Sequence, residues 1–517
     1  MKLSLEDLIS PRDKYGQELV KAFLSQEKVN FIRASPGTGK TYAAVAFSLW
    51  RALNNDRIAI FMRTRNEINH ALEISNRLSR SLLSRNINPP LIVPVGGKET
   101  LCRFPPENPA IIKWWCQIIR CEYISRRRSS RLRQLILEQR PSNLREYFIL
   151  AREENVCPYF AYQELCASSP IVLATHPYFI RDEFYERIGN RDILIVDEAH
   201  NLLKIITGRI KIQAFEEAKR ILKHLGENIP SNIRRLWSLN QKEEAIVLSQ
   251  YESYLESTGF QVRVGEEFLK IQTPLNLLKR RLLSARQIFL ISSTLYPSGL
   301  YKTLFSQKIP SRTHIIPGLF KNTEKRYIAV LKIGLSSKIE YRTKRSYQKY
   351  AKTIEMIINQ INKPTIIVTP SYNFAEELSE LLDLDIVRDD SNILDNVIIT
   401  VARGRLAEGV DVKIGERVPE ILVIAGLPYP ERNEEILKII RFYSKYYDIK
   451  FSKLLKMIET SEMISGLLQA AGRVGRQKKG AVVIIDDRLP LLGLKIPVYT
   501  TLGSLIKALK NFFNEPS

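Results

Sequence analysis

The chain has 517 residues, which is enough for more than one domain with its own core. Lysine and arginine total 78 against 55 aspartate and glutamate, so the net charge of +23 favours a polyanionic partner, either nucleic acid or an anionic membrane. The sequence has no run of about 18 apolar residues, and its start, "MKLSLEDLISPRDKYGQ", lacks a signal peptide's apolar stretch, so we expect a cytoplasmic protein without a membrane partner.

Short apolar runs recur along the chain, and helical stretches such as "KTYAAVAFSLWRAL" separate many of them. This alternation is typical of parallel sheets flanked by helices. The runs are "VNFIRA", "RIAIFMRT", "IVLATH", "DILIVD", "QIFLISST", "TIIVTPS", "NVIITVA", "EILVIAG" and "AVVIIDD". The first five precede residue 295 and the last four follow residue 364, which predicts an α/β protein with two sheets.

Two segments break this alternation. Residues 94–165 hold few strand signals but most of the cysteines, whereas residues 203–280 have a continuous helical pattern rich in lysine and glutamate. We predict that both segments are insertions into the first sheet domain.

The first sequence motif follows the first apolar run. In "ASPGTGKTYAA", residues 34–44, two glycines precede a lysine and a threonine at the joint between a strand and a helix. Glycines let backbone N–H groups turn toward a phosphate, and the next helix presents its positive end. We predict an ATP-binding loop in which Lys40 reaches the β and γ phosphates and Thr41 holds Mg²⁺. A glycine-rich turn that arose by chance is the alternative.

Four cysteines lie in the first insertion: Cys102, Cys116, Cys121 and Cys157. An odd total of five cysteines, without a secretion signal, argues against disulfides and for metal binding or buried thiols. Four thiolates suit a cubane iron–sulfur cluster, and a tetrahedral zinc site or plain thiols are the alternatives. We expect the fifth, Cys166, to be a small buried hydrophobic residue.

The same insertion is strongly cationic. "RCEYISRRRSSRLRQ" includes Arg126, Arg127 and Arg128, with tryptophan and tyrosine nearby. Cations beside stacking aromatics are typical of single-strand binding, so we predict a nucleic-acid contact here. A solvated helix face is the alternative.

A second motif, "DILIVDEAH", ends an apolar strand with an acidic pair. Ligands of open α/β sheets collect at the carboxyl ends of the strands. We predict that Asp197 holds Mg²⁺ and that Glu198 orients and deprotonates the attacking water. For His200, a surface position that caps a helix is the alternative.

These motifs, in this order, resemble the superfamily 2 helicases, and within them the archaeal-like xeroderma pigmentosum group D (XPD) type with an iron–sulfur domain. Further segments resemble the same family. They are "PRDKYGQ", "FMRTRNE", "LATHPYFI", "SSTL", "RGRLAEGVD" and "QAAGRVGR". The cysteine order is also similar, although four residues separate Cys116 from Cys121 where two are expected.

The resemblance implies roles for residues along the whole chain. It places ATP against Gln17, Ser35, Gly37, Thr38, Gly39, Lys40, Thr41, Glu408, Gly409 and Asp411. It makes Gln469, Arg473 and Arg476 catalytic, because arginines from a second domain stabilise the charge of the transferred phosphoryl group. It places nucleic acid against Arg63, Thr64, His176 and Tyr178.

The resemblance also implies two RecA-like helicase domains. The first comprises residues 1–93, 166–202 and 281–300, and the second residues 301–517. An iron–sulfur insertion at 94–165 and a short helical, arch-like insertion at 203–280 interrupt the first domain.

We therefore expect a monomeric ATP-dependent helicase that moves 5′ to 3′ on single-stranded DNA and opens forked DNA, using ATP, Mg²⁺ and a 4Fe-4S cluster. The alternatives are an ATP-dependent clamp or remodelling factor without unwinding activity, and RNA as the track, because contacts to phosphate and sugar carry little sequence information.

Overall fold

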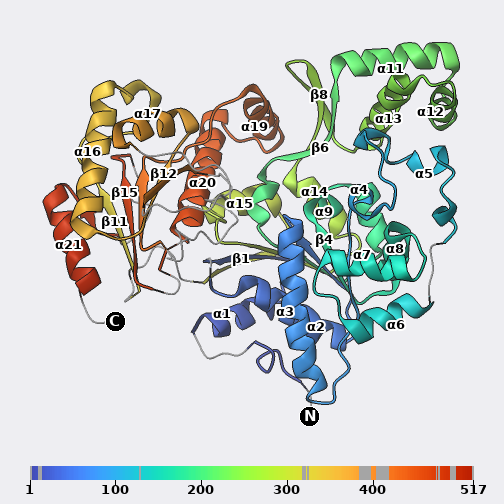
Figure 1. Ribbon diagram of the computed structural model, residues 1–517, viewed down its shortest axis with the longest axis horizontal. Helices are drawn as coiled ribbons and strands as arrows, with labels where there is room; N and C mark the ends of the chain where they lie inside the picture. The colour runs from blue at the N-terminus through green and yellow to red at the C-terminus, as the bar shows by residue number, and fades with distance from the viewer. Residues whose placement is uncertain are drawn as a thin grey trace.

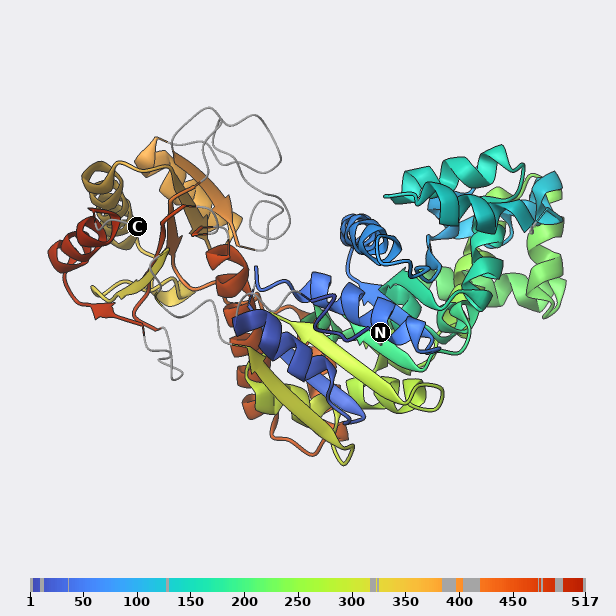
Figure 2. The same cartoon turned by 90° about the horizontal axis from the view of Figure 1, so that it is seen from below.

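The computed structural model describes residues 3–9, 14–35, 37–126, 130–316, 322, 325–383, 397–402, 419–472, 474–475, 478–488 and 496–514. Within these residues the chain forms two parallel sheets, each flanked by helices, in two lobes (Figure 1; Figure 2). The predicted α/β fold with two parallel-sheet domains is confirmed.

The first sheet has seven described strands in the order β10-β1-β9-β5-β2-β4-β3, all of them parallel. The strands are β1 (Val29–Ala34), β2 (Ile58–Met62), β3 (Ile92–Pro94), β4 (Ile171–Thr175), β5 (Ile193–Val196), β9 (Gln287–Ser292) and β10 (Ser311–Ile316). The predicted end of the first domain at residue 300 is too early, because β10 pairs with β1 and extends this sheet to residue 316.

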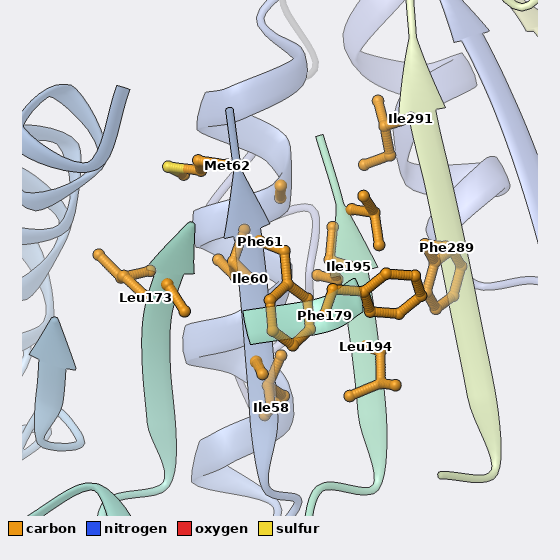
Figure 3. Close-up of a cluster of buried hydrophobic side chains, with 14 of the residues drawn as sticks. Ile58, Ile60, Phe61, Met62, Leu173, Phe179, Leu194, Ile195, Phe289 and Ile291 are labelled. Carbon is orange, nitrogen blue, oxygen red and sulfur yellow. The ribbon is translucent and has the colours of Figure 1, made fainter. Parts of the chain in front are cut away.

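The central strands of this sheet are apolar along their whole length because helices cover both faces. Every residue of β2, β5 and β9 is buried. Figure 3 shows Phe61, Phe179 and Phe289 beside the isoleucines and leucines of these strands. The surrounding helices include α1 (Lys14–Phe23), α2 (Lys40–Leu53), α3 (Arg65–Leu83), α8 (Pro158–Ser168), α9 (His176–Ile180), α10 (Asp182–Tyr185), α14 (Pro274–Arg281) and α15 (Ser298–Phe305).

The second sheet has six described strands in the order β13-β12-β14-β15-β11-β16, again parallel. They are β11 (Arg326–Leu331), β12 (Thr365–Thr369), β13 (Val397–Val401), β14 (Ile421–Ala425), β15 (Gly480–Ile485) and β16 (Val498–Tyr499). The helices of this part of the chain include α16 (Lys344–Ile361), α17 (Tyr372–Leu382), α19 (Glu434–Tyr446), α20 (Phe451–Ala471) and α21 (Leu502–Asn514).

The first insertion consists of short helices. They are α4 (Lys98–Leu101), α5 (Trp115–Ile118), α6 (Ser130–Gln139) and α7 (Leu144–Glu153), with 3₁₀ turns at Pro109–Ile111 and Glu122–Ile124.

The sequence predicted a continuously helical second insertion, and this prediction is wrong. The helices α11 (Ile212–Leu225), α12 (Ile229–Ser238) and α13 (Lys242–Glu256) stand on an antiparallel sheet of β6 (Ile205–Lys211), β7 (Phe260–Val264) and β8 (Glu267–Gln272). Apolar and polar residues alternate in "FQVRV", a strand period that the abundant lysine and glutamate concealed. A tight turn at Gly265, with φ of +53°, joins β7 to β8.

The two insertions pack against each other. Trp115 contacts Trp237 edge to face with 5.7 Å between ring centroids, and the Trp114 indole N–H donates to Glu252 over 2.7 Å. Ile111 of the first insertion is fully buried in the same apolar cluster as the helices of the second. The insertions therefore form one structural unit on the first domain (Figure 1).

Candidate functional site

The phosphate-binding loop has the local structure that its glycines predict. Gly37 and Gly39 both have φ of +81°, in the left-handed region that glycine adopts most easily. The Thr38 hydroxyl donates to the carbonyl of Ser35 over 2.7 Å, and α2 begins at Lys40. The loop thus lies directly before the N-terminus of a 14-residue helix, where the free N–H groups and the helix dipole favour an anion.

The acidic pair lies beside this loop. The Thr41 hydroxyl donates to Asp197 Oδ2 over 3.1 Å, although 155 residues separate the two in sequence. Asp197 directly follows β5 and is 5% exposed, and Glu198 turns the chain with φ of +46°. The parallel sheet accounts for this proximity, because β1 and β5 both pair with β9 and end at the same edge.

The two carboxyl groups have opposite pKa shifts. Burial, and then the neighbouring Glu198, raise the pKa of Asp197 to about 6, although the charge of Lys40 opposes the shift. Burial also acts to raise the pKa of Glu198, but a hydrogen bond from His200 and the charge of Lys40 outweigh it and hold that pKa well below its usual value. Glu198 therefore stays ionised to lower pH than Asp197 and can accept a hydrogen bond from water.

A serine at the end of β9 holds Glu198. The Ser292 hydroxyl donates to Glu198 Oε2 over 2.8 Å and accepts from His200 Nδ1 over 2.8 Å. The Thr294 hydroxyl lies 3.0 Å from the same Ser292 oxygen. His200 therefore belongs to the acidic site and is not a surface residue. The segment "SSTL" contacts the carboxylate directly.

Gln469 approaches this site from the second half of the chain. It lines a pocket with His200, Asn201 and Lys204, which follow the acidic pair, and with Tyr301 of α15. Gln469 lies near the C-terminal end of α20. Arg473 and Arg476, predicted to act with it, lie outside the described residues, as do Glu408, Gly409 and Asp411.

Two predicted strand contacts are internal and do not line a surface. His176 is 6% exposed, and its Nε2 lies 2.7 Å from the carbonyl oxygen of Asp197. Because burial lowers the pKa of His176 to about 4, the ring is neutral and Nε2 carries the proton that it donates. Tyr178 is 4% exposed and donates to the carbonyl of Gly96 over 3.1 Å. The assignment of both residues to nucleic acid is corrected, since neither is accessible to a strand.

Other predicted contacts lie at accessible positions. Arg63 is half-buried at the end of β2, and Thr64 caps α3 through a reciprocal pair of hydrogen bonds with Glu67. Gln17 is exposed on α1. The side chain of Arg126 is 43% exposed and lies over the ring of Tyr123, with 5.1 Å to the centroid. Arg127 and Arg128 lie outside the described residues.

The four cysteines of the first insertion line one pocket, together with Lys98, Arg103, Phe104, Tyr123 and Tyr159. Cys116 and Cys157 are buried, and burial raises the pKa of the Cys102 and Cys157 thiols, with neighbouring thiols adding to the shift. Among the described residues, no group of three or more histidine, cysteine, aspartate or glutamate side chains is arranged to hold a metal ion. Cys166 lies elsewhere and is buried, as expected.

Sequence reasoning missed several residues around the acidic pair. Tyr301 and Ser461 share a hydrogen bond of 3.0 Å, and Lys204 and Glu462 form an ion pair of 2.5 Å. None of the four belongs to a recognisable motif. Each pair joins segments 160 or more residues apart, so only the folded chain reveals these contacts.

No helix in the described part of the chain is long and apolar enough to cross a membrane.

Comparison with known proteins identifies two families along the chain. The DEAD_2 family matches residues 63–217, and the helicase C-terminal domain family matches residues 390–491. A curated relative, "ATP-dependent DNA helicase XPD" of Sulfolobus acidocaldarius, is 24% identical over 348 residues, which cover 55% of this chain and 63% of the relative. The match therefore spans less than two thirds of that relative's length.

Solved structures with the same fold cover nearly all of the chain. The structure described as "XPD_Helicase" has a TM-score of 0.67 and 19% sequence identity, and the match covers 95% of this chain and 99% of the other. The "Structure of S. tokodaii Xpd4" has a TM-score of 0.54 and 15% identity, with 94% and 99% covered. These likenesses show a shared fold of two parallel-sheet domains.

Proposed function

We propose that the chain is an XPD-like superfamily 2 helicase that hydrolyses ATP to move along single-stranded DNA and to unwind forked duplex. The observation that carries this proposal is the meeting of Lys40, Thr41, Asp197 and Glu198 at one sheet edge, with Gln469 lining a pocket beside His200. This is the arrangement that a nucleotide held between two domains requires.

Thr41 and Asp197 would hold Mg²⁺. Their oxygens lie 3.1 Å apart, close to the spacing of roughly 3 Å expected for neighbouring ligands of an octahedral ion with bonds of about 2.1 Å. An ion held there would supply positive charge against the charge that develops on the transferred phosphoryl group. Lys40 would contact the β and γ phosphates from the start of α2.

Glu198 would position the attacking water. Hydrogen bonds from Ser292 and His200 fix its carboxylate, and the low pKa keeps it ionised. An orienting acceptor of this kind aligns a water for in-line attack on the γ-phosphate. His176 supports the site by fixing the backbone of Asp197.

The second domain would supply Gln469, Arg473 and Arg476 to the γ-phosphate, and Glu408, Gly409 and Asp411 to the nucleotide or strand. Gln17, Ser35 and Thr38 would complete the nucleotide contacts of the first domain. An arginine supplied by a second domain accelerates other nucleotide hydrolases by roughly 10³ to 10⁵, so we expect Arg473 or Arg476 to be nearly indispensable.

We propose a 4Fe-4S cluster in the pocket formed by Cys102, Cys116, Cys121 and Cys157. Four thiolates at one pocket fit the ligand demand of a cubane. Structural zinc sites usually use two close pairs of cysteines, whereas the four cysteines here include one close pair, Cys116 and Cys121. A cluster would link segments 55 residues apart in an insertion whose described helices are short.

The cluster insertion would lie at the DNA fork, where Arg126, Arg127 and Arg128 would contact the single-stranded DNA. Arg63 and Thr64 would contact the same DNA strand where it crosses the first domain. Separating a base-pair step costs on the order of 1.4 kcal/mol of stacking. A wedge fixed by four metal–thiolate links would resist this load. By family likeness, the protein would act as a monomer and travel 5′ to 3′.

The decisive test is strand displacement on forks that carry only a 5′ or only a 3′ single-stranded tail, with ATP turnover measured in parallel. We expect displacement of the 5′-tailed fork and turnover that rises with single strands. Turnover without displacement would identify an ATP-dependent clamp. An RNA-tailed fork tests whether DNA is the preferred track.

The cluster has its own test. Purified protein should be brown and contain about four irons per chain. Cys116→Ser should cost displacement far more than ATP turnover, because Cys116 lies in the insertion and not at the acidic pair. Cys166→Ser, which changes a cysteine outside the pocket, is the control. Equal losses of displacement and turnover in Cys116→Ser would rule out the wedge.

A further inference from the structure

One helix belongs to the cores of both domains. Leu454 and Ile458, in the first half of α20, are buried in the hydrophobic cluster of the first sheet. Met463, Leu467 and Ala471, in its second half, are buried in a cluster of the second sheet. The 21-residue helix has no break between them and lies between the two lobes (Figure 1; Figure 2).

Two polar contacts lie where α20 passes from one core to the other. The Ser461 hydroxyl is 3.0 Å from the hydroxyl of Tyr301, and both residues are 1% exposed. Glu462, the next residue, pairs with Lys204 over 2.5 Å, and their side chains are 18% and 26% exposed. We call these two contacts the α20 latch.

Both partners of α20 follow the catalytic motifs of the first domain. Lys204 comes directly after the short helix Ala199–Leu203 that continues the acidic pair. Tyr301 lies on α15, just beyond "SSTL", and its hydroxyl is 3.5 Å from the carbonyl of Thr294. The latch therefore joins α20 to both segments that hold Glu198.

The polar connection to Glu198 is short. Ser292 donates to Glu198 and lies 3.0 Å from the Thr294 hydroxyl, and the Thr294 carbonyl is within reach of Tyr301, which meets Ser461. Gln469 lies eight residues beyond Ser461, about 12 Å along the helix. A small rotation of α20 at the latch would therefore move Gln469 relative to Glu198.

We propose that Tyr301, Ser461, Lys204 and Glu462 are positioning residues for ATP hydrolysis: the latch sets the angle at which α20 presents Gln469 to the γ-phosphate. This inference rests on the proposed ATPase. It adds four residues outside the family motifs and assigns the coupling between the domains to one helix.

The test is a charge-exchange cycle on the ion pair. Glu462→Gln keeps the side-chain shape and Lys204→Gln removes the opposite charge, and each should lower the kcat of single-strand-stimulated ATP turnover by roughly tenfold, as expected for coupled neighbours. The KM for ATP should stay within about twofold of the wild-type value, because phosphate contacts in the first domain are intact. The exchanged pair Lys204→Glu with Glu462→Lys should recover most of kcat.

Tyr301→Phe tests the second contact without changing charge or packing, and it should lower kcat with little change in KM. Lys302→Gln, at the exposed neighbouring position on α15, is the matched control and should keep wild-type turnover. Thermal unfolding of each variant separates mispositioning from unfolding, since the latch variants should melt within a few degrees of the wild type.

Wild-type kcat in both Glu462→Gln and Tyr301→Phe would overturn the latch while leaving the ATPase intact. An exchanged pair no better than the single variants would overturn it as well. Absence of turnover in the wild-type protein would instead refute the proposed function on which the latch depends.

Discussion

Two aspartates occupy equivalent places in the two sheets, and the structure uses them differently. Asp197 follows the apolar strand β5 in "ILIVD", and Asp486 follows β15 in "VVIID". Both are buried at the carboxyl ends of central parallel strands.

The difference lies in the hydrogen-bond donors around each carboxylate. Asp486 accepts from the Ser337 N–H and hydroxyl at 3.0 Å each, from the Leu427 N–H at 3.1 Å, and from the backbone and guanidinium of Arg488 at 2.9–3.0 Å. Asp197 accepts from the Thr41 hydroxyl and from the N–H of its neighbour Glu198.

Their pKa values shift in opposite directions as a result. Burial acts to raise both, but the donors of Arg488 and Ser337 outweigh it and lower the pKa of Asp486, whereas Asp197 lies next to a second carboxylate and its pKa rises. Asp486, whose oxygens accept many hydrogen bonds, links the segments around it. Asp197, whose oxygens accept few, is available to bind a cation. Four predictions test this contrast.

The largest effect is expected at Asp197. Asp197→Asn removes the charge that a divalent cation needs, so ATP turnover should fall by roughly 10² to 10³-fold, the loss typical of removing one transition-state group. Steady-state turnover with excess Mg²⁺ measures this. Asp192→Asn, at the opposite end of the same strand, should keep most of the activity. An equally large loss of ATP turnover in Asp192→Asn would mean that any change to β5 disturbs activity, and not the loss of a metal ligand in particular.

Asp486→Asn should instead destabilise the second domain by about 3 kcal/mol, because it removes the charge that faces Arg488 and replaces one of the two acceptor oxygens with a donor. The free energy of unfolding in urea measures this at neutral pH. Since the folded pKa of Asp486 is lowered, its ionic contribution is fully present above the unfolded value of about 4 and is lost as the pH falls through the folded pKa. The difference between wild type and variant should therefore shrink below pH 4. A constant difference would exclude the ionic account.

Ser292→Ala should lower kcat by about tenfold, because Glu198 loses one of the donors that fix it, while His200 still contacts the carboxylate at 3.2 Å. Turnover at saturating ATP measures the change. Ser293→Ala, which alters the adjacent serine, is the control and should act weakly.

The smallest effect is expected for Ser337→Ala, which removes one hydroxyl of several donors to Asp486 but keeps the N–H contact. The free energy of unfolding should fall by about 1 kcal/mol with turnover unchanged. A drop in turnover comparable to that of Ser292→Ala would contradict the assignment of a structural role to Asp486 and a catalytic role to Asp197.

Local sequence determined the parts of this molecule that depend on local geometry. All nine predicted apolar runs contain strands, because buried parallel strands must be apolar along their whole length. The left-handed glycines at 37 and 39 and the helix that begins at Lys40 follow from the loop sequence itself.

Only the tertiary structure decided which polar residues meet. Local sequence does not distinguish Asp486 from Asp197, because their hydrogen-bond donors come from distant segments at Ser337 and Thr41. The sequence also predicted that His176 contacts nucleic acid, whereas packing buries its side chain against the backbone of Asp197. The sheet in the second insertion and the division of α20 between two cores likewise depend on contacts between segments far apart in the chain, which local patterns do not encode.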